Sequence, residues 1–160
     1  MRIMKRMTGF LLVFACLFSM AAYAQVSKSG ALKTARKMVP KTYKLTEAER
    51  DDDTGDWELE FFSPHNKIEY EVNINSRTGA VRRVEKDWKG PRPSGNMKIS
   101  KARAITIASG QFEGITITRI RKQKDKGRWI WRVLFDGKDC SGQIRINAVG
   151  KIQGWEKIFK

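Results

Sequence analysis

The fold can be inferred from Trp57-Glu58-Leu59-Glu60-Phe61, where bulky apolar residues alternate with glutamates. Successive side chains of a β-strand point to opposite faces of the sheet, so this pattern predicts a strand with one face in a core and the other in water. A related stretch, Trp129-Ile130-Trp131-Arg132-Val133, follows 72 residues later. This spacing indicates that the chain contains the same structural unit twice.

Other segments match at nearly the same offset. Val26-Ser27-Lys28 precedes two alanines just as Ile99-Ser100-Lys101 does, and Ile74-Asn75 precedes a glycine turn just as Ile146-Asn147 does. The segment between the copies is rich in glycine and proline, which is typical of a linker. We therefore divide the chain into an N-terminal segment 1–24, a first module 25–88, a linker 89–97 and a second module 98–160.

Each copy is expected to open with a helix capped by a serine, Ser27 or Ser100, because a serine oxygen accepts an unpaired amide of the first turn. Val39-Pro40 should end the first helix and Gly110 the second. The predicted strands cover residues 42–50, 57–63, 67–75 and 80–86, then 116–123, 128–135, 142–147 and 151–157.

Short loops make neighbouring strands antiparallel. The sequence therefore predicts an α+β fold of two tandem modules, each one helix packed on a four-stranded antiparallel sheet. The other face of each sheet should be open. A single continuous sheet would contradict this interpretation.

The N-terminus has the three parts of a secretory signal peptide. Arg2, Lys5 and Arg6 precede an apolar run at residues 9–18, and Ala22-Tyr23-Ala24 is a suitable cleavage site. A retained membrane anchor is the alternative, but a spanning helix needs about 20 apolar residues. A lipoprotein signal centred on Cys16 is a weaker alternative. We expect cleavage after Ala24 and a periplasmic or secreted protein, not an integral membrane protein.

Charge is distributed unevenly along a chain whose formal net charge is +15. Residues 25–95 hold 14 Lys and Arg against 12 Asp and Glu, whereas residues 96–160 hold 15 against 5. A basic half usually suggests nucleic acid, but export argues against that partner. Anionic lipid, an acidic cell-wall polymer or an acidic protein fits an exported chain better.

Few residues suit catalysis or metal binding. His65, the only histidine, follows a proline in a predicted turn, and one histidine excludes an imidazole metal cluster. The run that starts at Asp51 does not match a calcium loop, because its glycine comes one place early and its twelfth position is Phe62. We expect a solvated hairpin turn there, and we expect no catalytic residue, metal or cofactor. A hydrolase that uses His65 or Cys140 is the least favoured alternative.

Cys140 is the one cysteine after the signal segment, so no disulfide can form within the exported chain. We interpret it as a half-buried small apolar residue, with a disulfide-linked dimer as the alternative. The tryptophans divide into two groups. We expect Trp57, Trp129 and Trp131 in the core, whereas Trp88 and Trp155 are less constrained, so either could help to form an interface.

The open faces carry the candidate binding residues. Alternation directs acidic side chains outward in the first copy and basic ones outward in the second, with three apolar residues as anchors. These candidates are Glu58, Glu60, Glu69 and Glu71, then Arg119, Arg121, Arg132 and Arg145, and the anchors Phe62, Ile130 and Leu134. They are either ordinary solvated faces or one composite docking surface for a protein partner.

The pattern of one helix and four strands resembles the PepSY domain. The helix Ser100–Ala108 carries the resemblance, together with the strand Glu69–Asn75 and the turn Thr78-Gly79-Ala80-Val81. Asn75 stands where the family has an aspartate, and the second copy shortens this turn. Tandem modules of this shape are also similar in architecture to the β-lactamase inhibitory protein.

PepSY domains occur in propeptides of thermolysin-type metallopeptidases and in exported or membrane proteins of the cell envelope. The resemblance implies a non-enzymatic protein that binds or restrains a partner, with a peptidase as one candidate. The alternative is electrostatic binding of an anionic envelope component by the basic second module.

Overall fold

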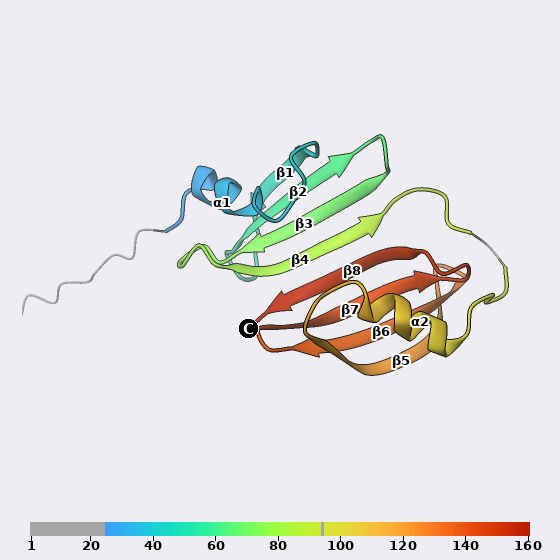
Figure 1. Cartoon of the computed structure of the whole chain (residues 1–160). Helices are drawn as coiled ribbons and strands as arrows, with labels where there is room; N and C mark the ends of the chain where they lie inside the picture. The colour runs from blue at the N-terminus through green and yellow to red at the C-terminus, as the bar shows by residue number, and fades with distance from the viewer. Residues whose placement is uncertain (1–24, 94) are drawn as a thin grey trace, which may run out of the picture.

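The structure, a computed structural model, describes residues 25–93 and 95–160, and the predicted signal peptide lies outside these residues (Figure 1). It contains two helices and eight strands in an α+β arrangement. In chain order these are α1 (Lys28–Ala35), β1 (Lys44–Arg50), β2 (Trp57–Ser63), β3 (Ile68–Ile74), β4 (Val81–Trp88), α2 (Lys101–Ser109), β5 (Ile115–Asp125), β6 (Arg128–Gly137), β7 (Cys140–Asn147) and β8 (Ile152–Phe159). Neither helix in the described part of the chain is long and apolar enough to cross a membrane.

All eight strands belong to one antiparallel sheet, in the order β1-β2-β3-β4-β8-β7-β6-β5 (Figure 1). Strands β4 and β8 pair from Arg83 opposite Ile158 to Asp87 opposite Gly154. The expectation of a separate sheet for each module is therefore wrong. Each half alone would leave two outer strands with free N–H and C=O groups, and the pairing of β4 with β8 satisfies one from each half. Alternation within a strand does not show which outer strands meet.

The helix starts were predicted correctly. The Ser27 hydroxyl oxygen accepts a hydrogen bond from the Gly30 amide at 3.2 Å, and that of Ser100 accepts one from the Arg103 amide at 3.1 Å. Helix α2 ends at Gly110 as predicted. Helix α1, however, ends at Ala35 rather than near Val39, because a turn over residues 36–38 precedes the proline.

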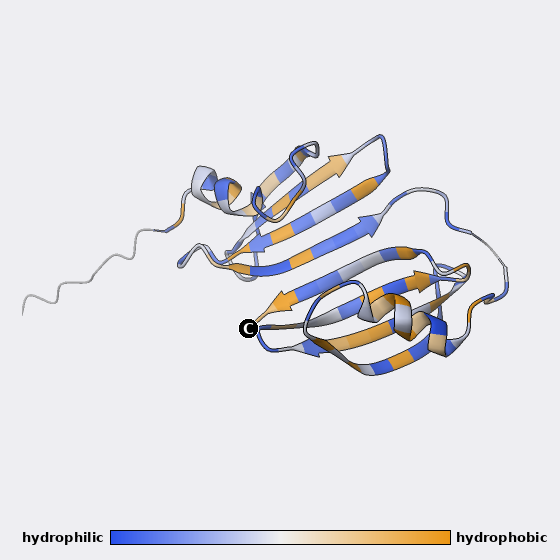
Figure 2. Cartoon of the chain, in the orientation of Figure 1, coloured by the Kyte–Doolittle hydropathy of each residue, from blue (hydrophilic) through white to orange (hydrophobic). Residues whose placement is uncertain are grey.

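Both helices cover the same face of the sheet. Directly opposed residues form a row across all eight strands, namely Leu45, Phe61, Tyr70, Lys86, Trp155, Ile144, Val133 and Ile120. Ala31 and Ala35 of α1 pack in one core cluster, Ala104 and Ala108 of α2 in another, and Trp155 contacts both. Apolar and polar residues alternate along these strands (Figure 2). The reverse side of the sheet, which no helix covers, is called the open face below.

One predicted correspondence between the halves is shifted. The indole Nε1 of Trp57 donates to the Val26 carbonyl at 2.8 Å, and it is Trp131, not Trp129, that donates to the equivalent carbonyl of Ile99, at 3.3 Å. A shift of two residues leaves each side chain on its predicted face. Trp129 lies outside both core clusters, with the Lys122 amine 4.7 Å from its ring centroid, so its predicted core role is wrong.

The halves share their strand irregularities as well. The first strand of each half carries one extra residue, at Thr46 and at Thr118. The last strand of each half also carries one extra residue, at Arg82 and at Gln153. Such bulges change the direction in which a side chain points.

Candidate functional site

The open face changes from acidic to basic across the sheet. A second row of directly opposed residues crosses it, in the strand order given above: Glu47, Glu60, Glu71, Glu85, Glu156, Gln143, Leu134 and Arg119. The predicted acidic and basic candidates therefore lie on one continuous face. They do not meet directly, because a strip of ion pairs separates them.

Two arginines organise this strip. Arg83 of β4 contacts Glu71 at 2.9 Å and Glu156 at 2.7 Å, and it also pairs with Glu85. Because Glu156 belongs to β8, Arg83 links the two halves of the sheet. These side chains are shielded enough from water for the attraction to exceed that of a surface pair.

Arg145 of β7 makes the second set of links. Its Nη2 lies 2.9 Å from a carboxylate oxygen of Glu85 and 3.1 Å from one of Asp87, both on β4. Glu69, another predicted candidate, pairs with Lys89 at 2.6 Å. Arg145, Glu69 and Glu71 thus have partners inside the molecule, so a structural role accounts for them.

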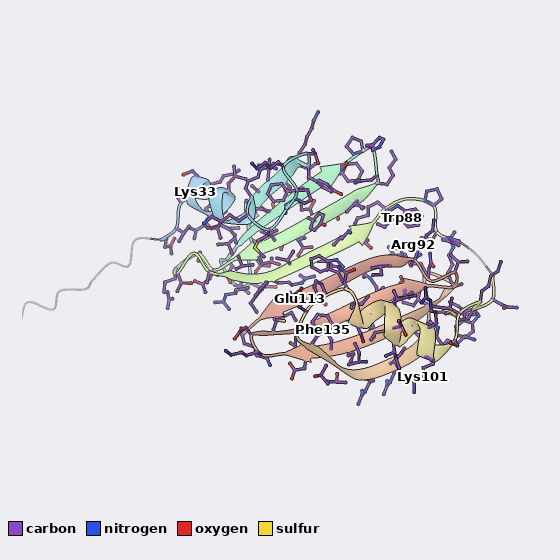
Figure 3. All side chains as sticks on the ribbon, in the orientation of Figure 1. Lys33, Trp88, Arg92, Lys101, Glu113 and Phe135 are labelled. Atoms are coloured by element: carbon purple, nitrogen blue, oxygen red, sulfur yellow. The ribbon has the colours of Figure 1, made fainter. Side chains whose placement is uncertain are left out.

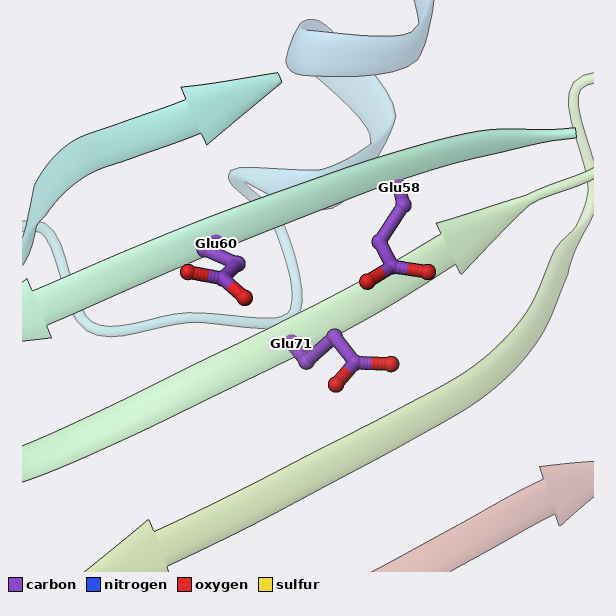
Figure 4. A group of neighbouring side chains, drawn as sticks. All are labelled: Glu58, Glu60 and Glu71. Atoms are coloured by element: carbon purple, nitrogen blue, oxygen red, sulfur yellow. The ribbon is translucent and has the colours of Figure 1, made fainter. Parts of the chain in front are cut away.

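Glu58, Glu60 and Glu71 converge on the acidic side of the open face, and their carboxylates point toward one another from β2 and β3 (Figure 4). One oxygen from each lies within 4.8 Å of the others. Burial raises the pKa of Glu60 and of Glu71, and the neighbouring glutamates raise both further, while Arg83 opposes the rise at Glu71. Three carboxylates could ligate a hard cation, but the Glu71 carboxylate already forms an ion pair with Arg83. We assign no metal to this cluster.

Three arginines surround a hollow of about 210 Å³ at the other side of the open face. We call Arg119, Arg121 and Arg132 the basic patch; Gln123 and Leu134 complete its lining. Arg121 lies directly opposite Arg132 in the β5–β6 pair. Within the described residues none of the three forms an ion pair, and the buried Nε of Arg132 has no hydrogen-bond partner.

The three predicted apolar anchors do not form one cluster. Ile130 is only 1% exposed, so its predicted role as a surface anchor is wrong. It lies on the predicted face, but alternation does not indicate how deeply a residue is covered. Phe62 and Leu134 are partly exposed, on β2 and β6, and four strands lie between them.

Arg92, in the linker, contacts two strands that are far apart in the sheet. No sequence pattern identified this residue. Its guanidinium contacts Asp125 of β5 at 2.7 Å and Asp87 of β4 at 3.5 Å. Three strands lie between β4 and β5, a separation of about 19 Å in a flat sheet at the usual strand spacing. One side chain can reach both carboxylates only because the sheet curls toward its open face at this end. The Gly- and Pro-rich composition of residues 89–97 is typical of a linker and offers no signal for this contact.

The residues considered for catalysis lie apart. His65 is exposed in the predicted turn between β2 and β3. Cys140, 7% exposed, is more deeply buried than expected and is a free thiol. The turn at Asp51 is confirmed as a hairpin turn, in which the Asp51 carboxylate accepts from the amides of Asp53 and Thr54. The hydrogen bonds from Thr54 lower the pKa of Asp51.

Comparison with known families supports the resemblance drawn from the sequence. Residues 25–85 match the PepSY family, described as "Peptidase propeptide and YPEB domain". These residues include α1 and the first three strands, together with most of β4. The resemblance to PepSY is thus confirmed for the first half of the fold.

Comparison with solved structures gives a crystal structure from Clostridium difficile 630, of a protein provisionally described as a lipoprotein. It shares 16% identity over 82% of this chain and 93% of its own, with a TM-score of 0.36. A similarity this low carries no argument about function. Comparison with curated proteins gives no match.

Proposed function

We propose that this chain is an exported, non-enzymatic binding protein of PepSY type that holds a protein partner on its open face. The basic patch is the observation that carries the proposal. Like charges directly opposite one another in a sheet destabilise it, and Arg121 opposite Arg132 is such a pair. An external ligand accounts for these residues better than the fold does.

The chemistry of the patch favours an acidic protein surface. Arginine side chains bind carboxylates with two parallel hydrogen bonds, and arginine is enriched among the residues that dominate binding energy. Leu134 supplies an apolar contact beside them. The family description includes peptidase propeptides, so a peptidase is the first partner to test.

The single sheet rules out two modules with separate sheets, but the repeated features support two tandem modules within that sheet, 25–88 and 98–160, joined by residues 89–97. Both halves have the serine cap, the indole hydrogen bond to the residue before that cap, and extra residues in the first and last strands. Independent origins would not be expected to reproduce all of these. We infer that the second half is a second, more divergent PepSY module that carries the basic patch.

Electrostatic adhesion to an anionic envelope component is the second candidate. The 15 basic and 5 acidic residues of segment 96–160 favour it. Adhesion through many exposed charges weakens steeply as salt rises, whereas an interface with a buried apolar contact weakens less.

The experiment replaces the three arginines of the basic patch with glutamine. The control replaces three exposed basic residues elsewhere, Arg77, Arg103 and Lys101, so that both variants lose the same charge. Each protein is immobilised and exposed to an envelope extract at low and high salt, and captured proteins are identified and assayed for peptidase activity.

We expect the patch variant alone to lose its specific partner, with no fall in its thermal midpoint because like-charge repulsion is relieved. If the patch variant captured the partner as well as the unchanged protein does, the proposal would be refuted. Equal loss in both variants, together with steep salt dependence, would establish adhesion instead. Arg145 is unsuitable for this test, because its contacts with Glu85 and Asp87 support the fold.

A further inference from the structure

A groove of about 470 Å³ lies where the two halves of the sheet meet, and it shares no residue with the basic patch. It is lined by the end of β4, the linker, and the β7–β8 turn with the start of β8. Trp88 is the last residue of β4, and Arg92 follows it in the linker (Figure 3). We call this hollow the junction groove.

The walls of the junction groove are mainly apolar. Ile68 and Trp88 come from β3 and β4, Ile152 from β8, and Pro91 and Pro93 from the linker. Concave, largely apolar sites with a few polar groups are the usual form of a ligand site. The polar groups then define which ligand fits.

Gln153 is the first of these polar groups. It is 3% exposed, yet its amide oxygen has no hydrogen-bond partner within the described residues. Gln153 is the extra residue of the β8 bulge, and it lines the groove. Buried polar groups in folded proteins normally have partners, so this oxygen is expected to take one from outside the described residues, either a water or a ligand.

Lys86 is the second polar group. It lines the groove half-buried, and no carboxylate of the described residues forms an ion pair with it. Its amine lies 5.9 Å from the centroid of the Tyr70 ring. Burial lowers the pKa of Lys86, which a bound anion would reverse. Lys151, exposed at the rim, adds a second positive charge.

From these groups we propose that the junction groove binds the carboxyl-terminal end of a peptide chain. The carboxylate pairs with Lys86, a peptide group pairs with the amide of Gln153, and an apolar terminal side chain lies against Trp88 and Ile152. A peptide group carries one donor and one acceptor, so it complements a carboxamide. A fatty acid supplies the carboxylate and the apolar part but leaves Gln153 without a partner.

The test titrates the purified protein with acetylated tripeptides that end in Leu, Phe or Val, with the same peptides amidated at the C-terminus, and with decanoate. Binding is followed by NMR shifts of the Gln153 side-chain amide and the Trp88 indole. The variants are Lys86→Gln and Gln153→Leu, and Lys101→Gln at the exposed start of α2 is the control. Each variant is first checked for a native spectrum.

We expect at least one free-acid peptide to shift both signals and its amidated form to bind about tenfold more weakly. Lys86→Gln should bind the two forms equally, and Gln153→Leu should weaken the peptide but not decanoate. Absence of shifts with all peptides, equal binding of acid and amide, or tighter binding of decanoate would overturn the proposal. These readouts do not involve the basic patch, so they can fail while the proposed function holds.

Discussion

Replacement of Arg83 by methionine is predicted to weaken the connection between the two halves of the sheet. Arg83 contacts Glu71, Glu85 and Glu156, and its side chain is 33% exposed. Removal of one partner costs about 3–5 kcal/mol for a buried ion pair and about 0–1 kcal/mol for an exposed one. An intermediate loss of about 2 kcal/mol is expected, which shifts the urea midpoint by about 1 M.

The pH dependence of this loss separates electrostatics from packing. Burial raises the pKa of Glu71 above its ordinary value of 4.5, and the charge of Arg83 partly opposes this rise. Without Arg83, the pKa of Glu71 in the folded variant should therefore be higher still. A carboxyl group whose folded pKa is raised contributes stability at low pH that is lost as pH rises through that value. The deficit of the variant should therefore be large near neutral pH and shrink as pH falls toward and below 4.5, the ordinary value for glutamate.

Urea unfolding followed by tryptophan fluorescence at about pH 7 and about pH 4 measures both deficits. Arg77→Met, in the exposed turn after β3, is the matched control and should change the midpoint little. A loss at neutral pH below about 0.5 kcal/mol would refute the reasoning, since surface substitutions lie in that range. A deficit that is the same at both pH values would attribute the effect to packing alone.

Three further predictions concern packing. Gly154→Ala should lower the free energy of unfolding by about 2–3 kcal/mol, because the new Cβ would lie 2.5 Å from the Lys86 carbonyl oxygen and 2.6 Å from Arg145 Nη2. An unchanged thermal midpoint would contradict this close contact. Trp131→Phe should lower the free energy of unfolding by about 1–2 kcal/mol in urea, because it removes the hydrogen bond to Ile99 as well as ring contacts. Trp129→Phe should lower it by less than about 0.5 kcal/mol. Equal losses would argue against Trp131, rather than Trp129, as the equivalent of Trp57. The Cys140 thiol, 7% exposed, should react with a thiol reagent only after unfolding; rapid labelling of the native protein, or a dimer on a non-reducing gel, would show that it is accessible.

Local signals were sufficient to predict the helix caps and the strands. Serine at an N-cap and the alternation around Leu59 depend on neighbouring residues, and both are confirmed. Strand β5 was predicted too short, because it continues to Asp125, just before a turn in which Lys126 and Gly127 have positive φ angles; β6 begins where predicted but continues to Gly137. A lysine in that conformation gives little signal in a single sequence.

Long-range relations could not be predicted in the same way. The pairing of β4 with β8 depends on which outer strands meet, and that choice leaves no periodic pattern in either strand. The same limit applies to the candidate site. The sequence indicated which face Arg119, Arg132 and Arg145 occupy, but only the structure shows that Arg145 has carboxylate partners, while the other two form no ion pair with any described residue. The burial of Ile130 is a relation of the same kind.

The single sheet also affects how the protein resists aggregation. Two separate four-stranded sheets would expose four unpaired strand edges, and the β4–β8 pairing leaves β1 and β5 at the margins of the sheet formed by the described residues. Exposed edges recruit other chains, and charged side chains and bulges discourage this. Strand β5 has both, with a bulge at Thr118 and the basic residues Arg119, Arg121, Lys122 and Lys124. The charges proposed to hold a partner thus also protect the margin of the sheet from self-association.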